Sequence, residues 1–177
     1  MNYIKFRFNA TEYNGWPKLK FLIDGDLYHD YEFLDNTAFV ELPLDLITGN
    51  HVLDIELYDK TFNNTLVIDG VIIKDQLVTL EEIFVDNVKV PDFVKYQGIY
   101  KVGDTKTPQA LTWGVNGTWT LNFEYPIIDW ILDQKSIYSN EYIKQDQWAT
   151  STYHPKKNQL LKDKLAMLEE SIANAKD

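Results

Sequence analysis

The chain has 177 residues, a formal charge of −10 at neutral pH and no cysteine. Hydrophobic residues make up 45% and charged residues 25%, which is typical of a folded globular protein and not of a disordered one. The negative charge argues against nucleic acid as a partner, because such binding depends on Lys and Arg contacts to phosphate. The absence of cysteine excludes disulfides, thiolate zinc sites and a cysteine nucleophile.

The sequence also gives no sign of a membrane partner. No apolar run approaches the roughly 18 residues needed to span a bilayer, and residues 1–6 alternate rather than forming the apolar block of a signal peptide. We therefore expect synthesis in the cytoplasm. The three N-x-Thr sequons, at Asn9, Asn63 and Asn116, carry no weight without secretion.

Alternating apolar and polar residues predict strands in the first half of the chain. The pair Asp24-Gly25 tolerates positive φ and predicts a tight hairpin turn between two of them. Pro43 is expected to stop another. The predicted strands cover residues 2–8, 19–23, 27–33, 37–42 and 51–57.

In the second half, Asp69-Gly70 is a strong two-residue turn signal and predicts a small β-ribbon from strands over 65–68 and 71–74. Residues 76–90 predict two strands or one bent strand, broken at Asp86-Asn87. Residues 92–117 are interpreted as a long loop, and residues 118–124 alternate again as a strand.

Many short strands separated by turn signals, with 14% aromatic residues, favour a mainly β fold. We predict an antiparallel, jelly-roll-like β-sandwich over residues 1–135. Parallel α/β folds are excluded because no crossover helices are predicted before residue 150.

The tail changes character. Residues 136–154 are predicted to form an extended arm, and residues 155–177 an amphipathic α-helix that follows Pro155. A helix this short is marginal alone, so it should dock on its own sandwich or on a neighbouring subunit. Its apolar stripe, the predicted assembly surface, consists of Leu161, Leu165, Leu168 and Ile172.

The search for catalytic chemistry gives no candidate residue. His29, His51 and His154 are far apart, and no hydrolase, phosphate-loop or EF-hand motif is present. His51 shares a strand face with apolar residues and is interpreted as a satisfied, half-buried histidine. Adjacent carboxylates such as Glu81-Glu82 point to opposite faces of a strand. We predict a protein that is not an enzyme and has no cofactor.

Four loop aspartates leave one alternative open. Asp59, Asp69, Asp75 and Asp86 could supply oxygen ligands to Ca²⁺, but aspartates of this kind more often form turns. Spacing alone does not choose between the two, and we assign no metal site.

Three segments of the sequence carry a pattern of strand residues, made up of Gly49, His51, Leu53, Ile55, Leu57, Val85, Asp86, Val88, Gly117, Trp119, Thr120, Leu121, Phe123, Pro126, Ile127 and Trp130. With these residues the sequence resembles a group of small virion structural proteins of contractile-tailed marine phages. The likeness covers about residues 1–132, and the sandwich of that group also looks like the calcium-dependent xylan-binding carbohydrate modules. The resemblance implies a virion location.

Two functions follow as hypotheses. The first is a non-catalytic structural or accessory protein of the head, neck, tail or baseplate, present as a homo-oligomer or in multiple copies and bound to other virion proteins. The alternative is a carbohydrate-binding module for attachment, with Trp16 and Trp113 as candidate ligand-binding rings in turn-like contexts. At least two coplanar exposed aromatics on one face of the sandwich would favour glycan binding, and a large apolar patch along the helix would favour assembly.

Overall fold

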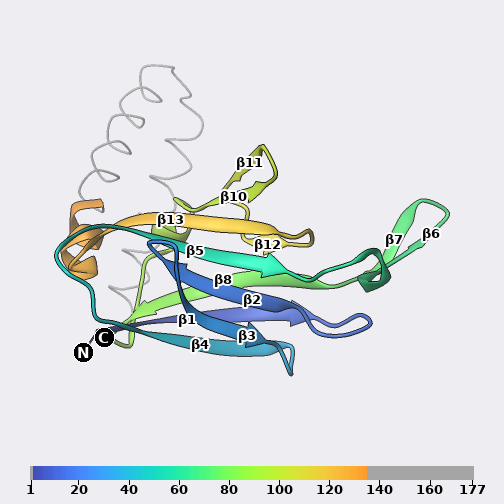
Figure 1. Ribbon diagram of the computed structural model, residues 1–177, viewed down its shortest axis with the longest axis horizontal. Coiled ribbons are helices and arrows are strands. Elements are labelled where there is room, and N and C mark those ends of the chain that lie inside the picture. Colours follow the sequence, from blue (N-terminus) through green and yellow to red (C-terminus); the bar gives the residue numbers. More distant parts are fainter. Residues whose placement is uncertain (1, 135–177) are drawn as a thin grey trace, which may run out of the picture. The chain divides into compact units, whose positions relative to one another are not determined.

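The structure, a computed structural model, describes residues 2–134. These residues form two antiparallel sheets packed face to face, with a separate two-stranded ribbon at one end (Figure 1). The predicted antiparallel β-sandwich is therefore confirmed. The predicted arm over 136–154 and helix over 155–177 lie outside the described residues, as do Leu161, Leu165, Leu168 and Ile172.

The first sheet has the strand order β12-β8-β1-β4, and β9 pairs with β8. Its central strand β1 pairs antiparallel with both β4 and β8. The strands are β1 (Asn2–Thr11), β4 (Thr37–Leu44), β8 (Leu77–Val85), β9 (Val88–Lys89) and β12 (Thr112–Trp113).

The second sheet has the order β11-β10-β13-β5-β2-β3. Strands β5 and β13 are its longest pair and run antiparallel along their whole length. The strands are β2 (Lys18–Ile23), β3 (Asp26–Glu32), β5 (Gly49–Tyr58), β10 (Ile99–Val102), β11 (Thr105–Pro108) and β13 (Gly117–Tyr125).

Three short elements complete the described part of the chain. The 3₁₀ turn η1 (Phe62–Asn64) leads into the ribbon of β6 (Thr65–Ile68) and β7 (Val71–Asp75), and the helix α1 (Asp92–Lys95) follows β9. A further helix over residues 127–134 follows β13 and buries Ile127, Trp130 and Ile131. No helix among residues 2–134 is long and apolar enough to cross a membrane.

The core lies between the sheets because the strands alternate in burial. Every second residue of β2 and of β4 is buried, as the period of two requires. Phe8 lies near the middle, with its ring about 6 Å from those of Phe6, Phe21, Phe33 and Trp113. These aromatic residues fill the space that one sheet alone would leave open to water.

Two details of the sequence interpretation need correction. Strand β4 continues through Pro43, which pairs with Tyr3 at the edge of the sheet, where a missing N–H costs no ladder bond. Residues 92–117 are not one loop, because they contain α1, β10, β11 and β12. These elements have only two to four residues, which is too short for a period of two to be visible.

Candidate functional site

The ribbon of β6 and β7 exposes an unusual number of apolar side chains. Its turn residues Asp69 and Gly70 both have positive φ (51° and 78°), as a two-residue hairpin turn requires. Five apolar side chains of the ribbon are 51–61% exposed, namely Val67, Ile68, Val71, Ile72 and Ile73. Scattered apolar residues are normal on a surface, but a contiguous group marks an interaction site.

Both faces of the ribbon are apolar. Val67 lies opposite Ile72, and Ile68 lies opposite Val71. Because successive residues of a strand point to opposite faces, these two pairs occupy the two faces. Figure 1 shows the ribbon extending beyond the ends of the two sheets, so the sandwich does not cover either face.

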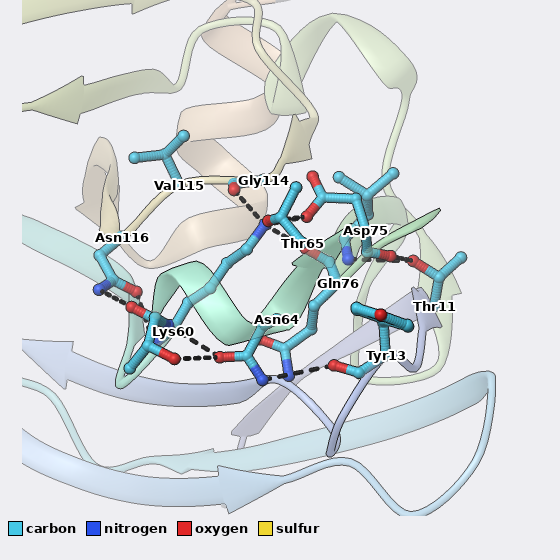
Figure 2. A network of polar contacts seen from close by, with 12 residues as sticks. Thr11, Tyr13, Lys60, Asn64, Thr65, Asp75, Gln76, Gly114, Val115 and Asn116 are labelled. Atoms are coloured by element: carbon cyan, nitrogen blue, oxygen red, sulfur yellow. Dashed lines mark hydrogen bonds and ion pairs between the residues drawn. The ribbon is translucent and has the colours of Figure 1, made fainter. Parts of the chain in front are cut away.

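The root of the ribbon is held by a buried ion pair. The Lys60 Nζ donates to Asp75 Oδ1 at 2.6 Å, to the Gln76 carbonyl at 2.8 Å and to the Gly114 carbonyl (Figure 2). The side chains of Lys60 and Asp75 are only 6% and 14% exposed. Thr65 Oγ1 donates to the same carboxylate oxygen at 2.6 Å, so both charges have hydrogen-bond partners.

The root of the ribbon, where the chain enters β6 and leaves β7, also makes polar contacts to β1 and to the segment that follows β1. Thr11 Oγ1 donates to the Asp75 carbonyl at 2.7 Å and accepts from the Leu77 N–H at 3.0 Å. Asn64 Nδ2 donates to the Asn14 carbonyl at 3.0 Å, and Gln76 Nε2 to the Gly15 carbonyl at 2.9 Å. Both ends of the ribbon are therefore fixed to the sandwich, although its apolar residues have no cover.

Apolar surface continues beside this root. Phe62 is 99% exposed, and Val115 is exposed as well. Together with the stem of Lys60 they line a cavity of about 240 Å³, whose other walls are Thr61, Thr65, Gly114 and Asn116. The ribbon and this cavity define one interaction surface.

Trp16 lies at a second, polar cavity of about 160 Å³. Its ring is partly buried against the core, and Tyr58 is a second aromatic wall. Lys18 Nζ donates to Asp59 Oδ2 at 2.9 Å, and this hydrogen bond and the Asp59 charge raise the pKa of Lys18. The Tyr58 hydroxyl donates to Asp30 at 2.6 Å, which raises the pKa of Tyr58 to about 12.

Trp113 is not at this cavity, and its ring is not exposed as the role of a candidate ligand-binding residue requires. The side chain is 1% exposed and stacks on Tyr100, with ring centroids 5.2 Å apart and planes within 6°. Its Nε1 donates to the Ala110 carbonyl at 2.8 Å. A ring enclosed in this way has no face left for a sugar. Trp119 and Trp130 are buried as well.

The remaining polar candidates have structural contacts. The ring nitrogens of His51 lie 2.6 Å from Asp24 Oδ2 and 2.8 Å from the Ile47 carbonyl, which confirms that this histidine is satisfied, although it is buried rather than half-buried. Asp59, Asp69 and Asp86 have positive φ and form turns, as the turn interpretation predicts. Among residues 2–134, no group of three or more His, Asp or Glu side chains is arranged to hold a metal ion.

The sequence predicted the ribbon but not its exposure. The available signal was the run Leu66-Val67-Ile68 before the turn and Val71-Ile72-Ile73 after it. Strands with one wet face alternate, whereas consecutive apolar residues indicate a strand that is covered on both faces. The run therefore pointed to a partner.

No protein-family model and no curated protein matches the chain. Two solved structures of the carbohydrate-binding module vCBM60 have a similar fold at 12% sequence identity. The selenomethionine form, described with calcium-dependent carbohydrate-binding modules, covers 68% of this chain and 90% of its own, with a TM-score of 0.48. The complex with galactobiose covers 68% and 98%, with a TM-score of 0.45. At this identity the likeness concerns the fold alone.

Proposed function

We propose that this chain is a non-catalytic structural protein of a phage virion and that it acts by assembly with other proteins through the β6–β7 ribbon. The observation that carries the proposal is a ribbon with apolar side chains on both faces and a root fixed by the pair of Lys60 and Asp75. The virion setting rests on the resemblance carried by the sequence.

The energetics of the ribbon favour this function. Two strands alone are marginally stable in water, and an uncovered apolar ribbon is an aggregation hazard unless a partner covers it. Burial of each Val or Ile side chain stabilises a complex by about 1.5–3 kcal/mol. Because the root is fixed in place before binding, less conformational entropy is lost when the partner docks.

Two buried titratable side chains among residues 2–134 are engaged in structural contacts, which agrees with an assembly role. The buried histidine His51 is engaged by Asp24 and by a main-chain carbonyl, so its ring is not available as a base. The ammonium group of the buried Lys60 donates to three acceptors, so it is likewise not available for catalysis.

A polar-ribbon variant tests the proposal. Val67→Lys with Ile72→Glu, and Ile68→Glu with Val71→Lys, replace the two apolar pairs by cross-strand charge pairs, so that the ribbon and the net charge are retained. We expect the variant to fold and to lose incorporation into particles of the phage that encodes it. Normal incorporation would contradict the proposal.

A matched control uses exposed apolar residues that lie elsewhere. Leu34 and Val88 are exposed on other loops and strands, and Leu34→Lys with Val88→Glu also leaves the net charge unchanged. We expect this control to be incorporated like the wild type.

A second candidate function is glycan binding at the polar cavity of Trp16 and Tyr58. The observation that favours it is the combination of two aromatic walls with the polar side chains of Asn14, Glu32 and Gln76. Galactobiose and xylan are suitable probes, because vCBM60 is complexed with galactobiose and the sandwich of the phage group that the sequence resembles looks like xylan-binding modules. If this function exists, Trp16→Ala abolishes retardation on these glycans and the polar-ribbon variant does not.

A further inference from the structure

We propose that the polar cavity beside Trp16 binds the guanidinium group of an arginine side chain from the protein that covers the β6–β7 ribbon. The inference rests on the proposed function, since it names the chemistry of one contact that this partner makes. The cavity adjoins the ribbon, because its wall residues Asn64 and Gln76 are the residues that immediately precede β6 and follow β7. A partner seated on the root of the ribbon therefore borders the cavity.

Gln76 supplies an acceptor that the rest of the described chain leaves open. Its side chain lines the cavity and is only 3% exposed, and its Nε2 donates to the Gly15 carbonyl at 2.9 Å. This hydrogen bond fixes the amide plane, but no donor among residues 2–134 reaches Oε1. A buried polar side chain normally has its acceptor satisfied, so Oε1 favours an occupant that donates to it.

The charges in the wall favour a cation. The wall holds one ammonium, from Lys18, and two carboxylates, from Glu32 and Asp59. Lys18 Nζ is already bound to Asp59 Oδ2 at 2.9 Å. The Glu32 carboxylate, which lies across from Lys18 on β3, has no hydrogen bond or ion pair with another described residue. A positive group is therefore attracted, and Glu32 can pair with it.

The neighbouring row of the same sheet keeps this sign. Lys20 lies opposite Asp30 on β3 and opposite Glu56 on β5, so two carboxylates again flank one ammonium. Lys20 Nζ also lies 4.2 Å from the centre of the Tyr58 ring, and the Tyr58 hydroxyl donates to Asp30. One face of Tyr58 and its hydroxyl are thus occupied, which leaves Trp16 as the ring on which a ligand can stack.

A guanidinium group fits these three features together. It is planar, it stacks on aromatic rings, and it donates through several N–H groups in one plane, whereas an ammonium is a compact and strongly hydrated charge. It can therefore lie on Trp16 and donate to both Gln76 Oε1 and the Glu32 carboxylate. The cavity, at about 160 Å³, is smaller than the roughly 300–1,000 Å³ of pockets that enclose whole ligands, so it suits one side-chain head group.

Titration of the full chain with the peptide acetyl-Gly-Arg-Gly-amide tests the inference. The readout is the NMR signals of the Trp16 indole N–H and of the Gln76 side-chain amide. A citrulline peptide keeps the planar group without the charge, and a lysine peptide keeps the charge without the plane. We expect the arginine peptide to shift both signals and to bind about tenfold more tightly than either of the other two.

Two variants with the same change of charge locate the binding. Glu32→Gln removes the unpaired carboxylate and should raise the dissociation constant of the arginine peptide about tenfold. Glu124→Gln is the matched control, because Glu124 is an exposed residue of β13 that does not line the cavity, and it should leave the dissociation constant unchanged. Equal effects of the two variants would overturn the inference, since the net charge of the chain would then attract the peptide.

The peptides and a sugar separate the possible ligands of the cavity. If the arginine peptide does not bind, or if the citrulline or lysine peptide binds equally well, the guanidinium assignment is wrong. Galactobiose is the probe for the glycan function. Shifts of the Trp16 and Gln76 signals with galactobiose and none with the arginine peptide would overturn the inference and assign the cavity to a sugar.

The two proposals fail separately. If the arginine peptide does not bind but the polar-ribbon variant is lost from particles, the proposed ligand is wrong and the assembly function stands. If the arginine peptide binds at this cavity but the polar-ribbon variant is incorporated normally, the ligand stands and the assembly function is wrong.

Discussion

The sandwich and the ribbon are both antiparallel and both rich in apolar residues, but they differ in how far those residues are buried. In β2 and β4 every second side chain is buried between the sheets. In β6 and β7 the apolar side chains from Val67 to Ile73 are consecutive, apart from the turn, and more than half exposed. The same residue types thus serve the fold in one region and leave a surface uncovered in the other.

The difference shows that the burial of a strand residue depends on how apolar residues alternate along the strand and not only on how hydrophobic the residue is. An alternating strand has one face for the core and one for water, so the sandwich is complete by itself. A strand with apolar residues on both faces needs cover on both sides. The ribbon receives none from residues 2–134, and its hydrophobic residues therefore add little to the stability of the isolated chain.

The largest expected effect is on the free energy of unfolding, which should fall much more for a substitution in the sandwich than for one in the ribbon. Phe8 is fully buried among four aromatic rings, and Phe8→Ala should lower the free energy of unfolding by about 4 kcal/mol, because the cavity cannot close. Ile68→Ala, on the exposed ribbon, should cost less than about 1 kcal/mol. Urea denaturation of both variants measures the contrast. Equal losses would mean that the ribbon is part of the cooperative core.

A smaller effect is expected at the root, where the two regions join. Lys60→Met leaves the Asp75 carboxylate buried without its cation, which should cost about 3 kcal/mol. We expect faster proteolysis within the ribbon as well, since its anchor is lost. The comparison is Lys89→Met, which breaks the exposed pair with Glu82 at 2.5 Å and should change stability little. Similar behaviour of the two variants would show that burial of Lys60 is energetically unimportant.

The sequence was sufficient for most of the sandwich because its long strands alternate. Strands β1, β2, β5 and β13 follow from period and turn residues alone. It was insufficient for β10 to β12, which are too short to show a period. The enclosure of Trp113 was also not predictable, because it depends on the stacking of Tyr100 from the opposite sheet.

The candidate site was predictable in part. Asp69-Gly70 predicts the ribbon, and its consecutive apolar residues indicate missing cover. The contact that fixes the root of the ribbon could not be predicted. It joins Lys60, Asp75 and the Gly114 carbonyl from three separate segments, and no local sequence pattern indicates it. The space is available because residue 114 has no side chain: a Cβ there would lie 2.7 Å from Leu77.

The smallest expected effect concerns His51, which links the turn between β2 and β3 to the segment between β4 and β5. Its ring nitrogens face the Asp24 carboxylate and the Ile47 carbonyl, which both accept, so a cationic ring with a hydrogen on each nitrogen satisfies both acceptors. The hydrogen bond to Asp24, followed by that to Ile47, raises the pKa of His51. The bond from His51, followed by that from the Val52 N–H, lowers the pKa of Asp24.

These pKa shifts decide over which pH range His51 and Asp24 stabilise the fold. The raised pKa of His51 stabilises the fold fully below its unfolded value, about 6.5, and this is lost as pH rises through the folded pKa. The lowered pKa of Asp24 stabilises the fold above about pH 4 and is lost as pH falls through the folded pKa. The pair therefore contributes most between these values. Because Asp24 is 45% exposed, we expect about 1 kcal/mol or less.

Thermal denaturation of the wild type and of His51→Gln at pH 5.5 and pH 9 measures this contribution. The loss of melting temperature should be larger at pH 5.5, where the wild type keeps its cationic ring. Asp24→Asn is the companion variant, since Asn tolerates the positive φ of 54° at this turn and removes only the charge. It should reduce the same pH dependence. If the melting temperatures of the wild type and of His51→Gln differ by the same amount at both pH values, the charge of the ring contributes nothing. Packing alone would then hold the segments of Asp24 and Ile47 together.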